Sequence, residues 1–352
     1  MNNVAEPRYD YLVATRCFTY NHADYIEDAL RGFALQETDF PCVFIVVDDA
    51  SCDGEQDVLR HWASENLTYN ESRRAKWETM PYGELTIAPL KGKPNSTFVI
   101  ILLSQNHYQK GNSIKRFDYI APWFDNAKYQ ALCEGDDFWT VRDKLQRQVD
   151  FLENNPEYTM CYAKCRYYYQ SQNRFERTSW GGKSETFQEL LKGNTVPTLA
   201  AVSRSAVGLE YREQYEGKPI SSSWQMGDYP FWLFCSVKGE VFFMDWETGV
   251  YRVLDNSASH SRSIDKKMAF SMSMVDIMEF FNKEYAGGYS SKYFVRLRHI
   301  LRLRTYAIYG KIGSYLKEWF SIARKNPLFL FDIDGYKYFS FFLLPFIRKS
   351  KK

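Results

Sequence analysis

The chain has 352 residues, of which 45% are hydrophobic and 25% charged, and its formal net charge is +2. This apolar share is enough for a sizeable core, and the length suits one α/β catalytic domain with an appendage. The nearly balanced charge argues against a general nucleic-acid-binding protein. The seven cysteines match neither a disulfide framework nor a paired Cys-x-x-Cys zinc site, so they predict core thiols in a reducing cytoplasm. The polar segment 1–10 predicts no secretory signal.

The first predicted strand, 11–17, leads into three polar side chains, Thr19, Tyr20 and Asn21. Asparagine commonly caps helices, and we expect Asn21 to cap the helix that follows. That helix has one apolar face at helical spacing, formed by Ile26, Leu30 and Phe33. This part of the chain therefore predicts a strand, a polar turn and an amphipathic helix.

A second, buried strand is predicted over 43–47, where β-branched and apolar residues end abruptly at Asp48 and Asp49. The region 64–96 is polar and irregular, with short strand candidates such as 85–88, and we interpret it as an insertion before a strand over 97–103. Strands and helices alternate through this half of the chain. That alternation favours a parallel sheet with helices on both faces.

Three carboxylates, Glu134, Asp136 and Asp137, come directly after a strand-like run, 128–132. Carboxylates this close together repel one another unless a cation lies among them. Mg²⁺ or Mn²⁺ suits oxygen ligands and keeps positions open for substrate phosphates. Because ligands of open α/β sheets bind at the carboxyl ends of strands, these acids and the earlier acid pair predict one shared site. The alternative is a loop of solvated acids that caps a helix beginning near Thr140.

The second half of the chain carries one more acid of interest. A core helix is predicted by apolar residues at helical spacing, Leu145, Val149 and Leu152. The aromatic run 158–170 predicts a strand. Asp228 then stands just ahead of a helix-like run, 230–237, where an aspartate is common as an N-terminal cap.

Four segments, taken in order, carry a resemblance to a known enzyme family: Thr19-Tyr-Asn21, Val46-Val-Asp-Asp-Ala-Ser51, Cys133-Glu-Gly-Asp-Asp-Phe-Trp139 and Met226-Gly-Asp-Tyr-Pro-Phe-Trp232. They resemble the family-2 inverting glycosyltransferases of the GT-A fold, over roughly residues 8–255. The nearest likeness is to bacterial glycosyltransferases of surface-polysaccharide biosynthesis. The resemblance implies an α/β fold with a mostly parallel central sheet flanked by helices, and a C-terminal helical appendage.

The implied organisation is a GT-A catalytic domain over 1–260 and a helical C-terminal region over 261–352. The catalytic domain would divide into a nucleotide-binding half over about 8–157, with the insertion at about 64–96, and an acceptor half over about 158–260. The implied reaction moves one sugar from a nucleotide-diphospho-sugar, a UDP-sugar by family likeness, to a hydroxyl of a glycan or polyprenyl-linked acceptor. A single displacement inverts the anomeric centre.

The resemblance also implies roles for the site residues. Asp228 is the general base that takes the proton of the acceptor hydroxyl. Asp137, with Asp136 and Glu134, holds Mn²⁺ or Mg²⁺, which neutralises the departing diphosphate. The donor nucleotide is expected to contact Thr19, Tyr20, Asn21, Asp48, Asp49 and Asp136.

The resemblance weakens after Val250. The family often has a histidine where this chain has Leu254, so we assign the diphosphate contacts to Arg252 and His260. The Gln-x-x-Arg-Trp pattern of processive synthases is missing. Transfer of a single sugar is therefore expected instead of polymerisation.

The C-terminal region predicts helices and a membrane-binding tail. The stretch 292–319 has the alternation of basic and apolar residues found in basic amphipathic helices. In the tail, 336–352, the apolar run 339–347 is shorter than the ~20 residues needed to span a bilayer, and basic residues follow it. These features predict a cytoplasmic protein in peripheral contact with the inner face of the plasma membrane.

Two other classes of protein stay open. A nucleotidyltransferase also places acids and a metal on an α/β sheet, but it normally carries a Gly-rich basic phosphate loop, which this sequence lacks. A non-catalytic GT-A-like adaptor at the membrane surface would keep the fold without the chemistry.

Overall fold

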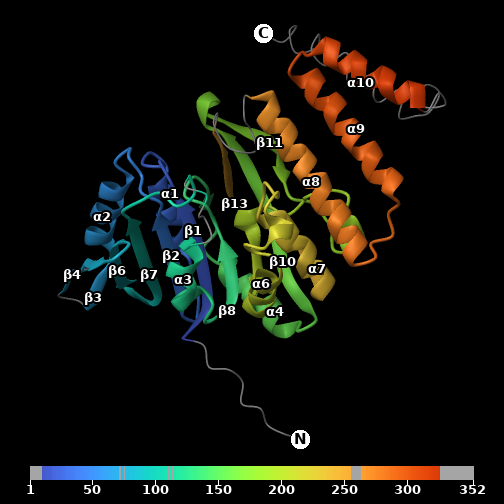
Figure 1. Ribbon diagram of the computed structural model, residues 1–352. Helices are drawn as coiled ribbons and strands as arrows, with labels where there is room; N and C mark the ends of the chain where they lie inside the picture. Colours follow the sequence, from blue (N-terminus) through green and yellow to red (C-terminus); the bar gives the residue numbers. More distant parts are fainter. Residues whose placement is uncertain are drawn as a thin grey trace, which may run out of the picture. The chain divides into compact units, whose positions relative to one another are not determined.

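The computed structural model describes residues 10–70, 73–74, 76–109, 111, 115–254 and 263–325. By their contacts, the residues divide into two compact units, the first made of 1–222 with 231–252 and the second of 223–230 with 253–352. The first unit contains the large sheet, and the second contains the long helices at the C-terminal end of the described chain (Figure 1).

Four strands form the parallel centre of the large sheet, in the order β7, β2, β1, β8. Their bounds are Tyr11–Thr19 for β1, Cys42–Asp48 for β2, Lys93–Leu103 for β7 and Ala127–Leu132 for β8. Every residue of β2 is buried, as expected for a parallel strand covered on both faces. The structure thus confirms the strands predicted over 11–17, 43–47, 97–103 and 128–132.

Strand pairs beyond this centre are antiparallel, among them β6 with β7 and β12 with β8, so the prediction of a mostly parallel sheet is wrong there. Strands β6 and β5 extend one edge, and β12, β10, β13 and β9 extend the other, with β11 paired to β10. Their bounds are Glu78–Met80 (β5), Gly83–Leu90 (β6), Phe138–Trp139 (β9), Tyr158–Tyr169 (β10), Arg174–Trp180 (β11), Ala201–Arg204 (β12) and Glu240–Val253 (β13). One reason for the antiparallel pairing of β6 with β7 is the turn at 91–92, because a connection that short joins only antiparallel neighbours.

The region predicted as an irregular insertion, 64–96, forms regular structure. It contains β5, β6 and the start of β7, and a separate two-stranded sheet of β3 (Thr68–Asn70) and β4 (Arg73–Arg74). Leu85 and Ala88 of β6 are buried. The strand candidate at 85–88 is thus confirmed within β6, whereas the extension of the main sheet by this region was not predicted.

Helices cover both faces of the sheet in the first unit. Buried side chains of α1, α2 and α4 join those of β1, β2 and β7 in one hydrophobic core. This core includes the predicted apolar positions Ile26, Leu30, Phe33, Leu145, Val149 and Leu152. The helices are α1 (Ile26–Leu35), α2 (Glu55–Asn66), α3 (Lys115–Phe124), α4 (Lys144–Asn154), α5 (Phe187–Leu190), α6 (Ser205–Gln214) and α7 (Asp228–Lys238), the last of which crosses into the second unit.

The side chain of Gln130, from β8, lies on the opposite face of the sheet. Its neighbours Tyr129 and Ala131 belong to the core, so Gln130 points to the other side of the sheet. There its Nε2 atom lies 3.5 Å from the carbonyl oxygen of Phe124 in α3, and a side chain at Gly208 of α6 would collide with it. Helices α3 and α6 therefore cover this second face.

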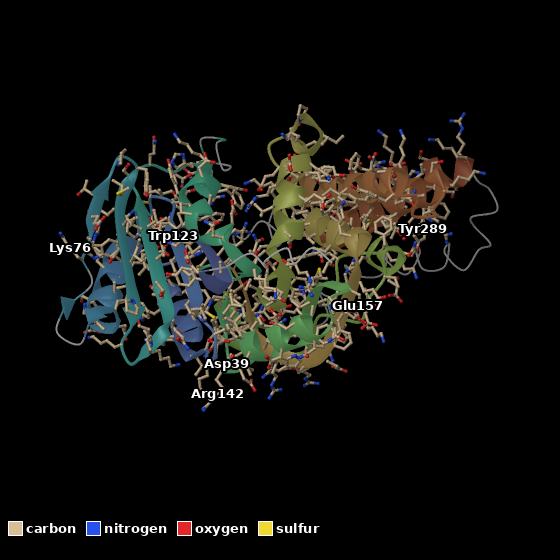
Figure 2. The ribbon with its side chains drawn as sticks, turned by 90° about the horizontal axis from the view of Figure 1, so that it is seen from below. Asp39, Lys76, Trp123, Arg142, Glu157 and Tyr289 are labelled. Carbon is tan, nitrogen blue, oxygen red and sulfur yellow. The ribbon has the colours of Figure 1, made fainter. Side chains whose placement is uncertain are left out.

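The segment after α1 fixes the start of α4. The backbone N–H of Glu37 donates to the carbonyl of Arg142 at 2.8 Å, and that of Asp39 donates to Oε1 of Gln146 at 2.9 Å. Buried Gln36 accepts from the N–H of Leu145 and donates to a neighbouring carbonyl. Figure 2 shows Asp39 and Arg142 close together at this contact. These bonds hold the chain that follows the acidic segment.

Lys144, the first residue of α4, carries an amine that is fully buried. Its Nζ atom has no hydrogen-bond partner among the described residues, and it lies 4.2 Å from the centre of the Trp139 ring. Burial lowers the pKa of Lys144 to about 7. Because the unfolded chain keeps the ordinary higher pKa, Lys144 costs stability below that value, and the cost grows as the pH falls towards about 7.

Replacing this lysine should therefore stabilise the protein. We expect Lys144→Met to raise the free energy of unfolding at pH 7 by roughly 1–3 kcal/mol, after allowance for the lost cation–π contact. The gain should be smaller at pH 9, where the folded lysine is neutral. Urea denaturation at both pH values measures it, with the exposed pair Lys128 and Glu153 as control, since Lys128→Met should change stability by less than about 1 kcal/mol. Equal gains at the two pH values would contradict this prediction.

The second unit contains three long helices, α8 (Ile264–Glu284), α9 (Ser291–Ile308) and α10 (Ile312–Lys325). Helix α9 packs against both α8 and α10, and a small core joins α9 to α10 (Figure 1). The predicted helix over 292–319 is two helices, because the chain breaks at Gly310, which has a positive φ of 66°. No helix of the described chain is long and apolar enough to cross a membrane. The predicted tail, 336–352, lies outside the described residues.

Candidate active site

The polar ends of three parallel strands meet at one edge of the sheet. Strand β1 lies between β2 and β8, and its last residue, Thr19, is in register with Asp48 at the end of β2. On the other side, Arg16 of β1 is in register with Leu132, directly before the acidic segment. Neighbouring strands lie about 4.8 Å apart, so the two acidic segments are about 10 Å from each other. Both acidic segments therefore follow parallel strands of one sheet, with only β1 between them.

The loops after β1 and β2 are bonded to each other. Asn21 has a left-handed backbone with φ of 56°, its N–H donates to Oγ of Ser51, and its Oδ1 accepts from the N–H of Cys52. The prediction that Asn21 caps the next helix is therefore wrong, because α1 begins after Tyr25 and has no side-chain cap. Asparagine tolerates the left-handed region, which lets it make this turn.

Glu55, at the start of α2, is a site residue that sequence reasoning missed. Its buried carboxylate accepts from the Thr19 hydroxyl, from the N–H of His22 at 2.8 Å and from the Ser51 hydroxyl at 2.9 Å. Burial raises the pKa of Glu55, and the hydrogen bonds partly offset that rise. Glu55 thus fixes Thr19 and joins the loops after β1 and β2. The signal in the sequence was an acid four residues after Ser51, in the first turn of a helix.

Asp48 and Asp49 differ in what their oxygens can still bind. Oδ1 of Asp48 accepts from the N–H of Ser51 at 3.0 Å and from Nε2 of Gln56 at 2.6 Å. Its Oδ2 is buried with no hydrogen-bond partner among the described residues, and burial raises the pKa of Asp48. A buried carboxylate oxygen without a donor is costly unless a ligand supplies one. Asp48 therefore has the unused acceptor that the predicted nucleotide contact requires.

The carboxylate oxygens of Asp49 are already hydrogen-bonded to other parts of the protein. Its two oxygens accept from the backbone N–H groups of His107, at 2.7 Å, and Tyr108, at 3.0 Å, and a nitrogen of Arg116 lies 3.6 Å away. The Arg116 guanidinium also stacks on the Phe18 ring, 4.4 Å from its centre. Asp49 therefore shapes the loop after β7, and the predicted nucleotide contact of Asp49 has no support from this arrangement.

The acidic segment after β8 runs directly over β1. The N–H of Gly135 donates to the Phe18 carbonyl at 3.2 Å. A Cβ atom at Gly135 would lie 2.1 Å from Oγ1 and 2.5 Å from Cβ of Thr19. Only glycine allows this approach, because Thr19 is itself held by Glu55. The close approach sets the height of the carboxylates above the sheet edge.

We expect Gly135→Ala to displace this segment. The added methyl group must push the backbone away from Thr19, at a cost of about 1–3 kcal/mol in stability, and should weaken binding of the donor nucleotide by tenfold or more. Isothermal titration with nucleoside diphosphates and thermal denaturation measure the two effects. Gly182→Ala is the matched control, since nothing lies within 4 Å of a Cβ atom there. Unchanged nucleotide affinity in Gly135→Ala would contradict the prediction.

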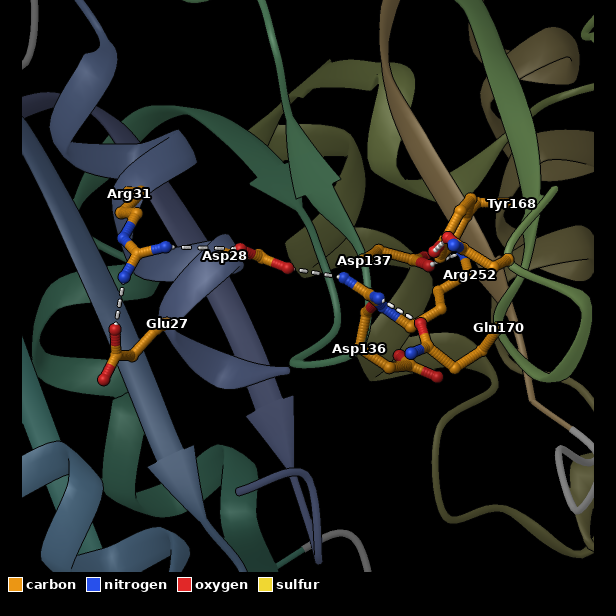
Figure 3. Close-up of polar contacts among 9 residues, drawn as sticks. Glu27, Asp28, Arg31, Asp136, Asp137, Tyr168, Gln170 and Arg252 are labelled. Atoms are coloured by element: carbon orange, nitrogen blue, oxygen red, sulfur yellow. Dashed lines mark hydrogen bonds and ion pairs between the residues drawn. The ribbon is translucent and has the colours of Figure 1, made fainter. Parts of the chain in front are cut away.

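Arg252, near the end of β13, holds the acidic segment in place (Figure 3). Its backbone N–H donates to Oδ1 of Asp137 at 2.8 Å, and its Nε donates to the carbonyl of Asp136 at 2.9 Å. Its two terminal nitrogens donate to Gln170 at 2.5 Å and to Asp28 at 2.7 Å. The side chain is only 5% exposed. Arg252 therefore positions the acidic segment, which differs from the predicted diphosphate contact, because its guanidinium nitrogens are already bonded to protein.

The carboxylates of Asp136 and Asp137 are an electrostatically unfavourable pair. Asp137 is buried, and burial together with the neighbouring charge of Asp136 raises the pKa of Asp137 well above its usual value. No side chain of the described residues hydrogen-bonds the Asp136 carboxylate. Two adjacent acids of this kind have the electrostatic environment that a divalent cation relieves.

The structure does not bring Glu134 into a metal site with this pair. Within the described part of the chain, no three acidic, histidine or cysteine side chains converge on a point where an ion could bind. One Glu134 oxygen lies 3.9 Å from a nitrogen of Arg16, and the side chain is 40% exposed. The arrangement of the described residues gives no support to Glu134 as a third ligand, since the Arg16 cation lies beside it. Asp136 and Asp137 stay as candidates.

The remaining predicted site residues are Tyr20, Asp228 and His260. The hydroxyl of Tyr20 accepts from Nε2 of Gln109 at 3.1 Å, which places Tyr20 beside the loop after β7. Asp228 is the first residue of α7, belongs to the second unit and accepts the N–H of Tyr229 at 2.7 Å. His260 lies outside the described residues.

Comparison with known proteins gives distant relatives. No protein-family model matches the chain. Curated relatives include the uncharacterized protein Rv1520 of Mycobacterium tuberculosis (strain ATCC 25618 / H37Rv) and the uncharacterized protein Mb1547 of Mycobacterium bovis (strain ATCC BAA-935 / AF2122/97). Each is 27% identical over 252 residues, which are 71% of this chain and 61% of the relative. The chain thus matches about six tenths of the length of these relatives.

Solved structures add information on the fold. The mannosyltransferase PcManGT from Pyrobaculum calidifontis, solved in complex with GDP-Man and Mn²⁺, is 15% identical, with 97% of this chain and 86% of that chain covered and a TM-score of 0.51. TarS of S. aureus, residues 1–349 in complex with UDP, is 12% identical, with 90% and 74% covered, and its TM-score of 0.47 is too low to support an inference. The chain therefore has a mixed α/β fold similar to that of a solved glycosyltransferase.

Proposed function

We propose that this chain is an inverting, metal-assisted glycosyltransferase of the GT-A type. It would transfer one sugar from a nucleotide-diphospho-sugar, a UDP-sugar by family likeness, to a hydroxyl of a glycan or lipid-linked acceptor in surface-polysaccharide biosynthesis. The observation that carries the proposal is the unpartnered Oδ2 of Asp48 at the same sheet edge as Asp136 and Asp137. The fold similarity to a mannosyltransferase supports it.

The donor nucleotide would bind at the ends of β1 and β2. Oδ2 of Asp48 is suited to accept a hydrogen bond from a ribose hydroxyl or a base N–H, as carboxylates at strand ends do in other nucleotide-binding folds. Thr19 ends β1, and Asn21 lies in the loop after it, which is bonded to the loop after β2. The nearby Tyr20 offers an aromatic ring at the same edge.

A divalent cation fits Asp136 and Asp137. Mg²⁺ is commonly held by one or two carboxylates together with substrate phosphates, so a third protein carboxylate is not required. Burial and the neighbouring charge of Asp136 raise the pKa of Asp137, and a divalent cation would favour its charged form. When bound, Mn²⁺ or Mg²⁺ would neutralise the negative charge that gathers on the departing diphosphate. The complex of PcManGT with Mn²⁺ supports this choice of ion.

Asp228 is the proposed general base. Its carboxylate would take the proton of the acceptor hydroxyl as that oxygen forms a bond to the anomeric carbon. The bond from that carbon to the diphosphate oxygen breaks in the same step, and its electron pair leaves with the nucleoside diphosphate. One displacement inverts the anomeric centre and needs no covalent enzyme intermediate.

The proposal also places the enzyme at the inner face of the plasma membrane. This placement rests on the apolar and basic tail, 336–352, and suits a polyprenyl-linked acceptor. It rests on the composition of the tail and not on the residues proposed for the chemistry of transfer.

Release of nucleoside diphosphate from a panel of UDP-, GDP- and dTDP-sugars tests the proposal. We expect slow hydrolysis of one donor with Mn²⁺ or Mg²⁺, abolished by EDTA. Isothermal titration of UDP and GDP with each metal accompanies it, because hydrolysis without an acceptor is slow. No hydrolysis together with no metal-dependent nucleotide binding would overturn the proposal and favour a non-catalytic adaptor.

A further inference from the structure

Helix α10 has an apolar stripe that the core of the second unit does not cover. The helix packs on α9 through Tyr315 and Ile322, which are buried. Ile312, Leu316 and Phe320 are 42%, 39% and 62% exposed. Residues four apart lie on one side of a helix, so these three side chains form a continuous stripe beside the packed one. We call Ile312, Leu316 and Phe320 the α10 stripe.

Basic residues border the α10 stripe. At 3.6 residues per turn, Arg324 and Lys317 lie about 40° and 60° around the helix from Phe320, and both are exposed. Exposed Lys325 ends the helix. The only acid of α10, Glu318, faces α9, where its Oε1 lies 2.6 Å from Nδ1 of His299. The exposed side of α10 is therefore apolar and cationic.

We propose that the α10 stripe binds the surface of an anionic lipid membrane. An apolar stripe bordered by lysine and arginine is the pattern of helices that lie in the membrane interface, with the apolar side chains below the headgroups and the cations among the phosphates. A second copy of the chain is a poorer partner, because two stripes in contact would bring Lys317 and Arg324 close to the cations of the other copy. The contact does not depend on the transfer reaction.

Binding to phospholipid vesicles tests the proposal directly. The full chain is mixed with vesicles of phosphatidylcholine alone or of phosphatidylcholine with phosphatidylglycerol, and the bound fraction is measured by flotation. We expect binding only to the vesicles with phosphatidylglycerol, and weaker binding as salt is added. The double variant Leu316→Glu, Phe320→Glu should reduce the partition coefficient about tenfold or more. Lys317→Gln and Arg324→Gln should each reduce it about fivefold.

The matched control puts the same charges on α10 outside the α10 stripe. Ser314 and Ser321 are exposed and lie about 100° or more around the helix from Phe320. The double variant Ser314→Glu, Ser321→Glu should lose clearly less binding than the stripe variant. Equal loss in both, or no binding of the unmodified chain to phosphatidylglycerol, would overturn the proposal.

Two further measurements test whether a second copy of the chain, or another part of the same chain, covers the α10 stripe instead of a membrane. Size-exclusion chromatography with light scattering would show a dimer that the stripe variant dissociates, if a second copy covers the stripe. A lower Tm of the stripe variant with unchanged vesicle binding would mean that another part of this chain covers it. Either result would overturn the membrane proposal.

Discussion

Asp137→Asn is expected to abolish metal-dependent binding of the donor, whereas Asp228→Asn is expected to keep donor binding and stop transfer. Asparagine at 137 keeps an oxygen for the N–H of Arg252 but loses the charge that a divalent cation requires. The affinity for nucleoside diphosphate with metal should fall about 100-fold or more. At 228 an amide cannot take a proton, so kcat should fall about 100- to 10,000-fold.

The stability of Asp137→Asn gives a second test. Burial and the neighbouring charge raise the pKa of Asp137, so the metal-free protein loses stability as the pH rises through that pKa. Asp137→Asn removes this loss, and in EDTA at pH 8 it should be at least as stable as the unmodified chain. Loss of activity with unchanged or higher Tm would then assign the effect to the site and not to unfolding.

Isothermal titration with and without Mn²⁺, a donor-hydrolysis assay and differential scanning calorimetry measure these quantities. Glu134→Gln is the matched control within the same segment, because Glu134 lies beside Arg16 and outside the proposed ligand pair. We expect it to keep metal-dependent binding within a few fold. Metal-dependent binding retained by Asp137→Asn and lost by Glu134→Gln would reverse the assignment of the ligands.

The sequence predicted the central strands and the edge where their acids lie, because both depend on local patterns. A buried strand such as β2 is a continuous apolar run, and the acids follow it directly in the chain. The outer strands were harder to predict. The pairing of β6 with β7 follows from a short turn at 91–92, and the polar composition of that region hides it.

The role of each side chain at the site depends on contacts over long sequence separations. Asp48 and Asp49 are adjacent in the chain, yet only Asp49 is bonded to the loop at 107–108. Glu55 is one acid among several near a helix start, and only the fold shows that it holds Thr19. Arg252 meets Asp137 from a strand 115 residues later. No spacing rule reports such pairings, so the role of each of these side chains could not be predicted from the sequence.

Arg252 is expected to control both the stability of the first unit and the affinity for the donor. Arg252→Ala removes a buried guanidinium that bonds Asp28, Gln170 and the Asp136 carbonyl, and should lower the free energy of unfolding by about 2–4 kcal/mol. Arg252→Lys keeps the charge but cannot reach all three partners, so it should recover only part of the loss. Urea denaturation measures both.

Arg31→Ala is the matched control, because Arg31 also pairs with Asp28 but is 67% exposed (Figure 3). Removing that surface pair should cost less than about 1 kcal/mol and leave donor binding unchanged. An equal loss of stability in Arg31→Ala and Arg252→Ala would contradict the role given to Arg252.

The pH profile separates positioning of the acidic segment from a merely structural role. The charge of Arg252 lowers the pKa of Asp137, so Arg252→Ala should raise that pKa further. Because a carboxylate must be deprotonated to bind a metal, donor binding by Arg252→Ala should be weakened more at pH 6 than at pH 8. The backbone N–H of residue 252 still donates to Asp137 in every variant, so Asp137 keeps this bond while the Asp136 carbonyl loses its donor. If the pH dependence of donor binding on the acid side is the same in Arg252→Ala as in the unmodified chain, then Arg252 is a structural residue that acts on the fold alone.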